Sequence, residues 1–503
     1  MTVSVHLPAF WPSFGWVETL TSLSLGCAFL GALVIWRRLC LDPLAHFPGP
    51  LSARFSNFNY SKSYLGGRQP YDVLKLHEKY GPVVRVAPNE LSFDTSQSWK
   101  DIYAQRKGHG TFIKSAFYDG GNFADQAHSI VSERNPEKHG EMRKFISNAF
   151  SDRSLREQEG LVTGVVDQFI DQIGRLGVVP HSVDMSLWTH LLTFDIIGEL
   201  AFGQTFGGVE SGEQHAWVVA VVESMAQASL SDTLQRFPIL GRVYLAMYPN
   251  WLKKLLVGAE KHQEFVISLV KKRMAAVTDR KDFMSHLLGQ REAAGISDIQ
   301  LSAHASDFVI AGSETTATTL ATAIYYLCRH PEILQRLQLE IRGAFNDYSK
   351  IDGRSTSGLK YLTAVCLEAL RILPPLSLAL PRVVPPGGDL VDGHFIPAST
   401  IVATAPLAAS MNPKSFNDPW KFDPERWLAM SPADQLEATQ PFSLGTRSCL
   451  GKGLAWLEMR LTLSKMLFKY DLRLVNNDVD WHRDMQMQLL WNKPRLMVQF
   501  AAV

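Results

Sequence analysis

The most chemically distinctive feature of this 503-residue sequence is one cysteine in a short glycine-containing segment. The segment FSLGTRSCLG spans residues 442–451 and places Cys449 between Gly445 and Gly451, two residues after Arg447. An apolar helical pattern follows at once, so we expect the sulfur to lie near a helix N-terminus, where free N–H groups favour a thiolate. A thiolate is a nucleophile or a metal ligand. The local sequence offers no general base for a nucleophile, although a distant histidine could supply one.

The same segment carries the features that a porphyrin would require. Iron would take the thiolate of Cys449, glycines would leave room for a flat face, and Arg447 would offer charge to carboxylates. The alternative is a buried cysteine in a glycine-containing turn, which an isolated C-x-G pattern would favour.

The segment AGSETT, residues 311–316, places an acid and an alcohol side by side in a helical pattern. Glycine costs about 1 kcal/mol relative to alanine inside a helix, so Gly312 suggests close approach of the backbone to a ligand. Glu314 and Thr315 offer groups that can relay protons. The alternative is a helix whose threonines bond back to their own carbonyl groups.

Glu368 and Arg371 lie three residues apart in CLEALRILPP and therefore share one helical face. Such pairs on a surface are worth only about 0.2–0.5 kcal/mol. Their neighbours are apolar, which predicts a buried pair. Breaking a buried pair is costly because the remaining charge is left without a partner.

The elements that must position these residues are mainly helical. Helical periodicity dominates residues 297–330, 331–345, 358–373 and 452–470, whereas β-like runs are fewer and start near Val83 and Asp392. No linker or repeat divides residues 51–503, so we predict one mainly α domain with small β-sheets.

Composition excludes several classes of protein. With 46% hydrophobic residues, 20% charged residues and a net charge of +1, the chain is neither disordered nor basic enough to indicate a nucleic-acid partner. Five scattered cysteines without a CxxC pair indicate neither a zinc site nor a disulfide framework, and fit a reducing compartment.

The N-terminus differs from the rest. Residues 19–36 carry no charge, and Arg37 and Arg38 follow immediately. This pattern predicts a retained membrane anchor over residues 1–38, a single pass that leaves the following domain cytoplasmic, and a proline-rich hinge over residues 39–50. A cleaved signal peptide or a buried core helix are the alternatives.

Residues 442–451 match F-x-x-G-x-R-x-C-x-G through Phe442, Gly445, Arg447, Cys449 and Gly451. This pattern resembles the haem-binding signature of the cytochrome P450 family, and the resemblance covers nearly the whole chain. It implies the P450 fold behind a single N-terminal transmembrane helix, with haem b bound through Cys449 as the axial iron ligand.

The resemblance also assigns roles outside this segment. In DPERW, Arg426 would join Glu368 and Arg371 as a third member of a structural cluster. In HGEMRK, His139 and Arg143 would contact the haem propionates, and Arg382 of PRVVPPGG would be a further partner. The alternative for His139 is a solvated basic residue.

By resemblance, the chain is an NADPH- and O2-dependent monooxygenase that inserts one oxygen atom of O2 into a hydrophobic small molecule. Glu314 and Thr315 would deliver protons. Because only about 50 residues follow Cys449, too few for a flavin domain, electrons would come from a separate NADPH-dependent flavoprotein reductase. The location implied is the endoplasmic reticulum membrane, and the style of the sequence is most similar to fungal members that modify terpenoid or polyketide secondary metabolites.

The expected walls of the substrate pocket are mainly apolar. The candidate walls are the loop from Phe112 to Phe123, the residues Phe308, Val309 and Ala311 of the helical segment that contains AGSETT, and Leu376 and Leu380 before Arg382. Two other functions stay open at this point. One is a haem-thiolate isomerase or dehydratase that needs no reductase, and the other is a non-catalytic membrane haem sensor or electron carrier.

Overall fold

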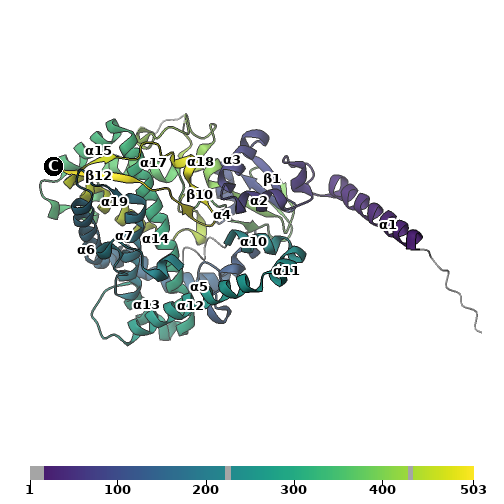
Figure 1. Ribbon diagram of the computed structural model, residues 1–503, viewed down its shortest axis with the longest axis horizontal. Helices are drawn as coiled ribbons and strands as arrows, with labels where there is room; N and C mark the ends of the chain where they lie inside the picture. The colour runs from purple at the N-terminus through teal and green to yellow at the C-terminus, as the bar shows by residue number, and fades with distance from the viewer. Residues whose placement is uncertain (1–15, 221–227, 429–433) are drawn as a thin grey trace, which may run out of the picture.

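A long central helix, α14 (Asp298–Arg329), organises the molecule, and the other elements are arranged around it (Figure 1). The computed structural model describes residues 16–220, 228–428 and 434–503. Residues 1–15, which belong to the predicted anchor over residues 1–38, lie outside the described part of the chain.

The described residues are mainly helical, as the periodicity predicted. The other α-helices are α1 (Trp16–Trp36), α2 (Phe58–Leu65), α3 (Gln69–Tyr80), α4 (Ser96–Tyr103), α5 (Pro136–Ser147), α6 (Asp152–Leu176), α7 (Met185–Phe202), α8 (Gly208–Ser211), α10 (Ala228–Arg236), α11 (Pro238–Met247), α12 (Pro249–Ala275), α13 (Phe283–Ala294), α15 (Pro331–Ala344), α16 (Gly353–Ser357), α17 (Lys360–Ile372), α18 (Pro406–Met411), α19 (Lys452–Lys469) and α20 (Trp481–Asp484). The four strongly periodic segments of the sequence correspond to α14, α15, α17 and α19, with ends that differ from the predicted ends by two residues or fewer.

The sheets are small, also as predicted. The strands are β1 (Val83–Ala87), β2 (Glu90–Phe93), β3 (Ile113–Lys114), β4 (Val183–Asp184), β5 (Arg382–Val383), β6 (Asp389–Val391), β7 (His394–Ile396), β8 (Ile401–Thr404), β9 (Tyr470–Leu474), β10 (Gln486–Met487), β11 (Trp491–Asn492) and β12 (Met497–Ala502). The largest sheet has the order β1-β2-β8-β5-β3, and a second has the order β4-β12-β9. The run from Asp392 forms two strands, but β7 pairs with β6 while β8 pairs with β2 and β5.

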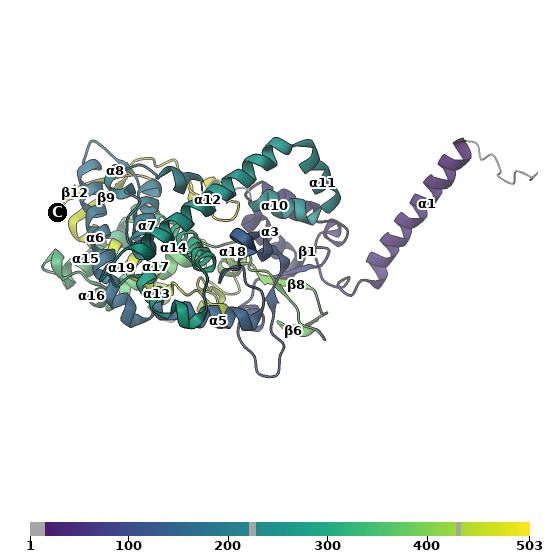
Figure 2. The ribbon, with the colours of Figure 1, turned by 90° about the horizontal axis from the view of Figure 1, so that it is seen from below.

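Helix α14 is buried along most of its length because other helices cover it. It packs along α7 and also contacts α12, α17 and α19. Its N-terminus is capped by Ser297, whose side chain accepts a hydrogen bond from the N–H of Gln300, and it ends before Pro331, which begins α15. The centre of the molecule is therefore a layered helical core, with the largest sheet on the side nearer the N-terminus (Figures 1 and 2).

Glu368 and Arg371 form a fully buried ion pair on α17. The Arg371 Nη2 and Glu368 Oε1 atoms are 2.7 Å apart, and Arg426 Nε donates to the same carboxylate at 3.1 Å. Asp434, which the sequence did not single out, accepts a hydrogen bond from Arg426 Nη1 at 3.0 Å. Arg371 also donates to the carbonyl oxygens of Ser410, Pro419 and Lys421. These contacts fasten the segment that leads into the Cys449 loop to α17.

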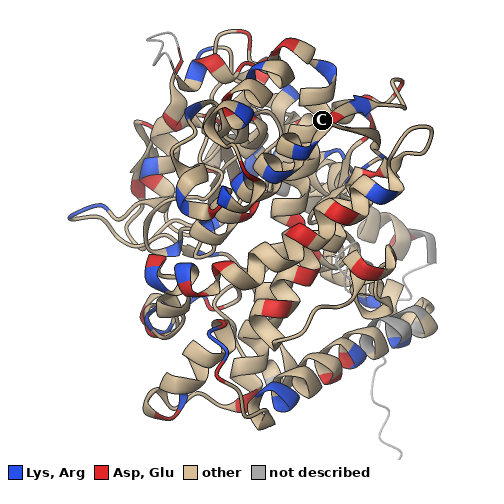
Figure 3. Ribbon diagram, turned by 90° about the vertical axis from the view of Figure 1, so that its left-hand side faces the viewer, with Lys and Arg blue, Asp and Glu red and all other residues tan. Residues whose placement is uncertain are grey.

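Helix α1 stands away from the body of the molecule (Figures 1 and 2). Its large apolar side chains are exposed, including Leu20, Leu23, Leu25 and Phe29. A transmembrane helix was predicted here, but in the described ranges no helix is both long enough and apolar enough to cross a membrane. Acidic and basic residues are interspersed along the ribbon in Figure 3, in keeping with the net charge of +1.

Candidate functional site

The Cys449 loop and α14 line one large cavity, together with parts of α5, α19 and the segment before β5. Its empty space, counted with its opening to solvent, is about 1480 Å³. The cavity brings together nearly all of the residues that the sequence singled out for chemistry.

Cys449 presents its side chain to this cavity. The loop is held in shape by the N–H of Cys449, which donates to the carbonyl oxygen of Phe442 at 2.8 Å, and by Arg143, which donates to that of Ser448 at 2.8 Å. Burial raises the pKa of the Cys449 thiol. The backbone N–H of Gly451, the charge of Arg143 and the N-terminus of α19 act in the opposite direction, as expected, but burial outweighs them.

The two glycines of the loop have different roles, which corrects the prediction that both lie against a flat ligand. Gly451 lines the cavity, and a Cβ there would meet no heavy atom within 4 Å. Gly445 does not line the cavity. Its φ is +72°, and a Cβ would lie 2.1 Å from the carbonyl oxygen of Tyr103, so glycine is required for a left-handed turn that packs against α4.

Four cationic side chains surround one part of the cavity: Lys114, Arg143, Arg382 and Arg447. Neutral oxygens hold them in place. Arg447 donates to the carbonyl oxygens of Glu133 and Arg134, and Lys114 to those of Ile130 and Val131. In the part of the chain that the structure describes, none of the four forms an ion pair with a carboxylate. The sequence had not singled out Lys114, which lies directly opposite Arg382 in the β3–β5 pair.

Because no carboxylate among the described residues pairs with these side chains, burial and their mutual repulsion lower the pKa values of Lys114 and Arg447. Burial and the charges of Arg447 and Arg382 lower the pKa of Lys114 to about 6. Burial and Arg382 lower the pKa of Arg447 to about 10. His139 is buried beside them, and burial together with Arg447 lowers its pKa to about 3, so its imidazole is neutral at physiological pH. Because like charges this close repel, the cluster is suited to an anionic ligand such as a pair of carboxylates.

One face of α14 forms the cavity wall opposite the cysteine loop. Phe308, Ala311, Gly312, Thr315 and Thr319 line it, at the spacing of a single helical face. Val309 was predicted to join them but is fully buried outside the lining, because it lies about a quarter turn from Phe308.

Glu314 and Thr315 are adjacent in sequence but point to different surroundings. The Thr315 hydroxyl reaches the cavity and donates to the carbonyl oxygen of Ala311 at 2.8 Å. Glu314 is buried outside the cavity lining, where its carboxylate pairs with His190 of α7 and with Lys493 Nζ at 2.6 Å. Burial would raise its pKa, but Lys493 and His190 hold it well below its usual range. The predicted acid–alcohol pair therefore presents only its alcohol to the cavity.

Gly312 has a packing role besides its place in the cavity wall. A Cβ at this position would lie 3.1 Å from Cδ1 of Ile197 on α7. The glycine therefore permits close contact between α14 and α7, as well as backbone approach to the cavity.

A carboxyl group that the sequence did not single out reaches the cavity from α19. Glu458 is 2% exposed, and its Oε2 atom has no hydrogen-bond partner among the described residues. Thr316 of α14 is its hydrogen-bonding partner, and burial raises its pKa to about 8. Glu458 lies nine residues after Cys449 and outside the motifs of the sequence, so only the packing of α19 on α14 identifies it.

The remaining walls are apolar, as expected for a hydrophobic ligand. Leu376 and Leu380 line the cavity, as predicted, and Phe150, Ile197 and Leu370 were not predicted. These three come from segments far apart in sequence that carry no local signal beyond hydrophobicity.

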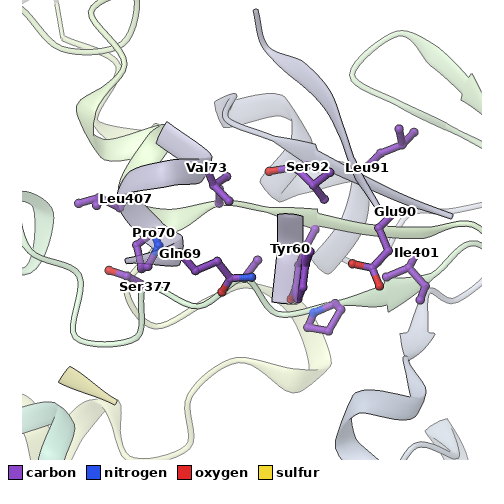
Figure 4. Close-up of a pocket in the computed structure, with 15 residues that line it drawn as sticks. Tyr60, Gln69, Pro70, Val73, Glu90, Leu91, Ser92, Ser377, Ile401 and Leu407 are labelled. Carbon is purple, nitrogen blue, oxygen red and sulfur yellow. The ribbon is translucent and has the colours of Figure 1, made fainter. Parts of the chain in front are cut away.

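A smaller pocket lies between α2, α3 and the edge of the largest sheet (Figure 4). The Glu90 carboxylate lies near Tyr60 in this pocket and pairs with Arg236 at 2.7 Å. Gln69 is hydrogen-bonded to Tyr60. Because these polar groups have partners within the chain, we place the functional site at the larger cavity.

Known proteins resemble this chain over nearly its whole length. A sequence model of the family described as Cytochrome P450 matches residues 47–500. The chain is 49% identical over 475 residues to "Cytochrome P450 monooxygenase ORF11" of Penicillium roqueforti, covering 94% of this chain and 97% of that protein. It is 42% identical over 467 residues to "Cytochrome P450 monooxygenase BipB" of Cochliobolus sativus, covering 91% and 92%. It is 40% identical over 476 residues to "Cytochrome P450 monooxygenase BOA3" of Botryotinia fuckeliana, covering 92% of each.

The raised pKa of Glu458 predicts a pH-dependent stability. Between its ordinary value of 4.5 and about 8, the folded protein keeps a proton that the unfolded chain releases. The stability that this group contributes is complete below its pKa in the unfolded chain and is lost as the pH rises through its pKa in the folded protein.

In thermal unfolding, the midpoint of the parent should therefore fall relative to that of Glu458→Gln from pH 5 to pH 8. Glu314→Gln is the control: the pKa of Glu314 is depressed, so its effect should be constant over this range. Parallel midpoints for the parent and Glu458→Gln would contradict the raised pKa.

Proposed function

The chain belongs to the cytochrome P450 family and is a P450 monooxygenase, and from this premise we propose that it modifies a hydrophobic small molecule of fungal secondary metabolism. The observation that carries the proposal is the cavity in which Cys449 faces the α14 wall beside a cluster of uncompensated cations. The match to monooxygenases of three fungi supports the biological setting. The apolar walls support a hydrophobic substrate, such as a terpenoid or polyketide.

The residues around the cavity fit haem b. Cys449 offers a thiolate to iron, and Gly451 leaves open space beside it. Arg143, Arg382, Arg447 and the neutral His139 would hold the two propionates, with Lys114 as an additional partner. When bound, a haem with a cysteine thiolate ligand supplies the electron density that favours O–O bond cleavage.

The protein's own groups then position and protect the reaction. The Thr315 hydroxyl holds a proton at the cavity wall, and the apolar walls formed by Phe308, Leu376 and Leu380 orient substrate and exclude water. Glu314 would take part in proton delivery from behind this wall, where Lys493 and His190 hold its carboxylate. It would not contact the substrate. We propose that a separate NADPH-dependent flavoprotein reductase supplies the electrons.

We also propose attachment to the endoplasmic reticulum membrane through the N-terminal segment, with the catalytic domain on the cytoplasmic side. The exposed apolar side chains of α1 support attachment, and Arg37 and Arg38 directly after it support the orientation.

Asn59 tests the orientation, since it is exposed and lies in the sequon Asn59-Tyr60-Ser61. On the cytoplasmic side it should carry no glycan, and the protein should stay with membranes during alkaline carbonate extraction. An endoglycosidase-sensitive mass shift that disappears in Asn59→Gln would reverse the orientation. Recovery of the protein in the carbonate supernatant would remove the stable attachment.

Cys449→His tests the haem ligand. The parent, reduced and exposed to carbon monoxide, should absorb at the long wavelength typical of thiolate haem, because the sulfur donates electron density to iron. Cys449→His should bind haem without that band, and product formation should stop. Cys328→Ser, which changes a cysteine outside the cavity, should keep the band. A folded Cys449→His protein that retains the band would overturn the assignment.

Thr315→Ala tests the proton that the α14 wall provides. General acid assistance is typically worth about 10²–10⁴-fold, so product formation should fall far more than NADPH consumption, with hydrogen peroxide accounting for the difference. Thr318 faces Lys493 rather than the cavity, and Thr318→Ala should keep the parent ratio. Equal product per NADPH in Thr315→Ala and the parent would remove this role. Conversion of a substrate without NADPH would instead favour an isomerase.

A further inference from the structure

Asp307 places a carboxylate in the wall that α14 contributes to the cavity. Asp307 lies one residue before Phe308 and one helical turn before Ala311, and its side chain lines the cavity. Burying a charged side chain costs free energy unless hydrogen bonds or an opposite charge compensate it.

The protein holds this carboxylate in one orientation. The N–H of Val131 donates to Asp307 Oδ2 at 3.0 Å, and the Ser129 side chain is also hydrogen-bonded to it. The neighbouring N–H of Ile130 donates to His304 Nδ1, one helical turn before Asp307 on the same helix. Asp307 is thus fixed between α14 and the 129–132 segment.

These contacts leave Asp307 able to accept more hydrogen bonds. An ionised carboxylate has about four acceptor positions, and the two contacts from Val131 and Ser129 do not fill them. Burial raises the pKa of Asp307 to about 6, so the group is ionised at neutral pH and acts as an acceptor. In the described ranges no cation lies within ion-pairing distance of Asp307. Lys114 instead donates to the carbonyl oxygens of Ile130 and Val131.

The chemistry of a matching group is a neutral hydrogen-bond donor on an apolar molecule. The other walls near Asp307 are apolar, and an alcohol loses less hydration than an ammonium when it enters such surroundings. A hydroxyl donates one hydrogen bond to a carboxylate and leaves the rest of the ligand against Phe308, Leu376 and Leu380.

We propose that Asp307 binds a hydroxyl group of the substrate, so that this enzyme oxidises an apolar molecule that already carries an alcohol. The inference rests on the proposed function and deepens it. The reaction that supplies the substrate must leave a hydroxyl on an apolar skeleton, as an earlier oxygenation does. This enzyme would therefore act after the first oxygenation of its substrate.

Equilibrium binding of two matched probes tests the proposal. Farnesene and farnesol share an apolar skeleton and differ by one hydroxyl. The full-length, haem-loaded parent should bind farnesol about tenfold or more tightly than farnesene, because a site built around a hydrogen-bond acceptor discriminates against a ligand without a donor. Calorimetry and the optical difference spectrum measure the two dissociation constants without turnover.

Two substitutions at Asp307 should lower the preference for farnesol over farnesene by different amounts. Asp307→Leu should remove the preference for farnesol. Asp307→Asn keeps an oxygen that can accept from Val131 and Ser129, and its neutral amide should reduce the preference severalfold without removing it. If Asp307→Leu fails to load haem, Asp307→Asn alone decides, and an unchanged preference in that variant overturns the proposal.

Ser129→Ala is the matched control for a purely structural role. It removes a partner of Asp307 from the 129–132 segment without changing the cavity lining, and it should keep the preference for farnesol. Loss of the preference in Ser129→Ala to the extent seen in Asp307→Leu would overturn the proposal. Equal affinity for both probes in the parent, or no binding of either, would also overturn it. NADPH-dependent oxygenation without a hydroxyl preference would refute this inference alone, and a hydroxyl preference without oxygenation would refute the proposed function alone.

Discussion

The buried carboxylate of Glu368 is the contact on which the geometry of the cavity depends. It accepts hydrogen bonds from Arg371, Arg426, the Trp427 indole and the backbone N–H of Asp423. A charge at this depth is tolerated only because these donors satisfy it, so the donors are held as firmly as the acceptor. Three of the four lie in the segment before the Cys449 loop or pack against it. The cluster thereby fixes the chain that leads into this loop relative to α17, and α17 packs directly on α14.

Charge is divided unequally around the resulting cavity. Lys114, Arg382 and Arg447 face it, and among the described residues their side chains donate hydrogen bonds to carbonyl and hydroxyl oxygens and not to carboxylates. Glu314, by contrast, is turned away and paired with Lys493 and His190. This separation leaves a positive region at the cavity that suits the anionic edge of a cofactor, and it keeps the Glu314 carboxylate away from that region. The same division makes Thr315 the member of the AGSETT segment that contacts the cavity.

Two carboxyl groups, those of Glu458 and Asp307, do line the cavity, and their protonation states differ. Glu458 has no cationic partner among the residues that the structure describes, so burial favours its neutral, protonated form. Asp307 is fixed by donors from the 129–132 segment and keeps its charge near neutral pH. One therefore holds a proton at the cavity, and the other offers an acceptor.

The sequence by itself determined the family, the mainly helical fold and the presence of Cys449, Arg143 and Thr315 at one site, because local motifs and helical periodicity depend on neighbours along the chain. It did not determine which way each side chain faces. Val309 and Glu314 point away from the cavity because of helical rotation, and Gly445 serves a turn against Tyr103. The roles of Lys114, Asp307 and Glu458 depend on contacts between segments far apart in sequence, which only the tertiary structure brings together. Burial and pairing set the charge of these groups, and both are properties of the packed structure rather than of residue type.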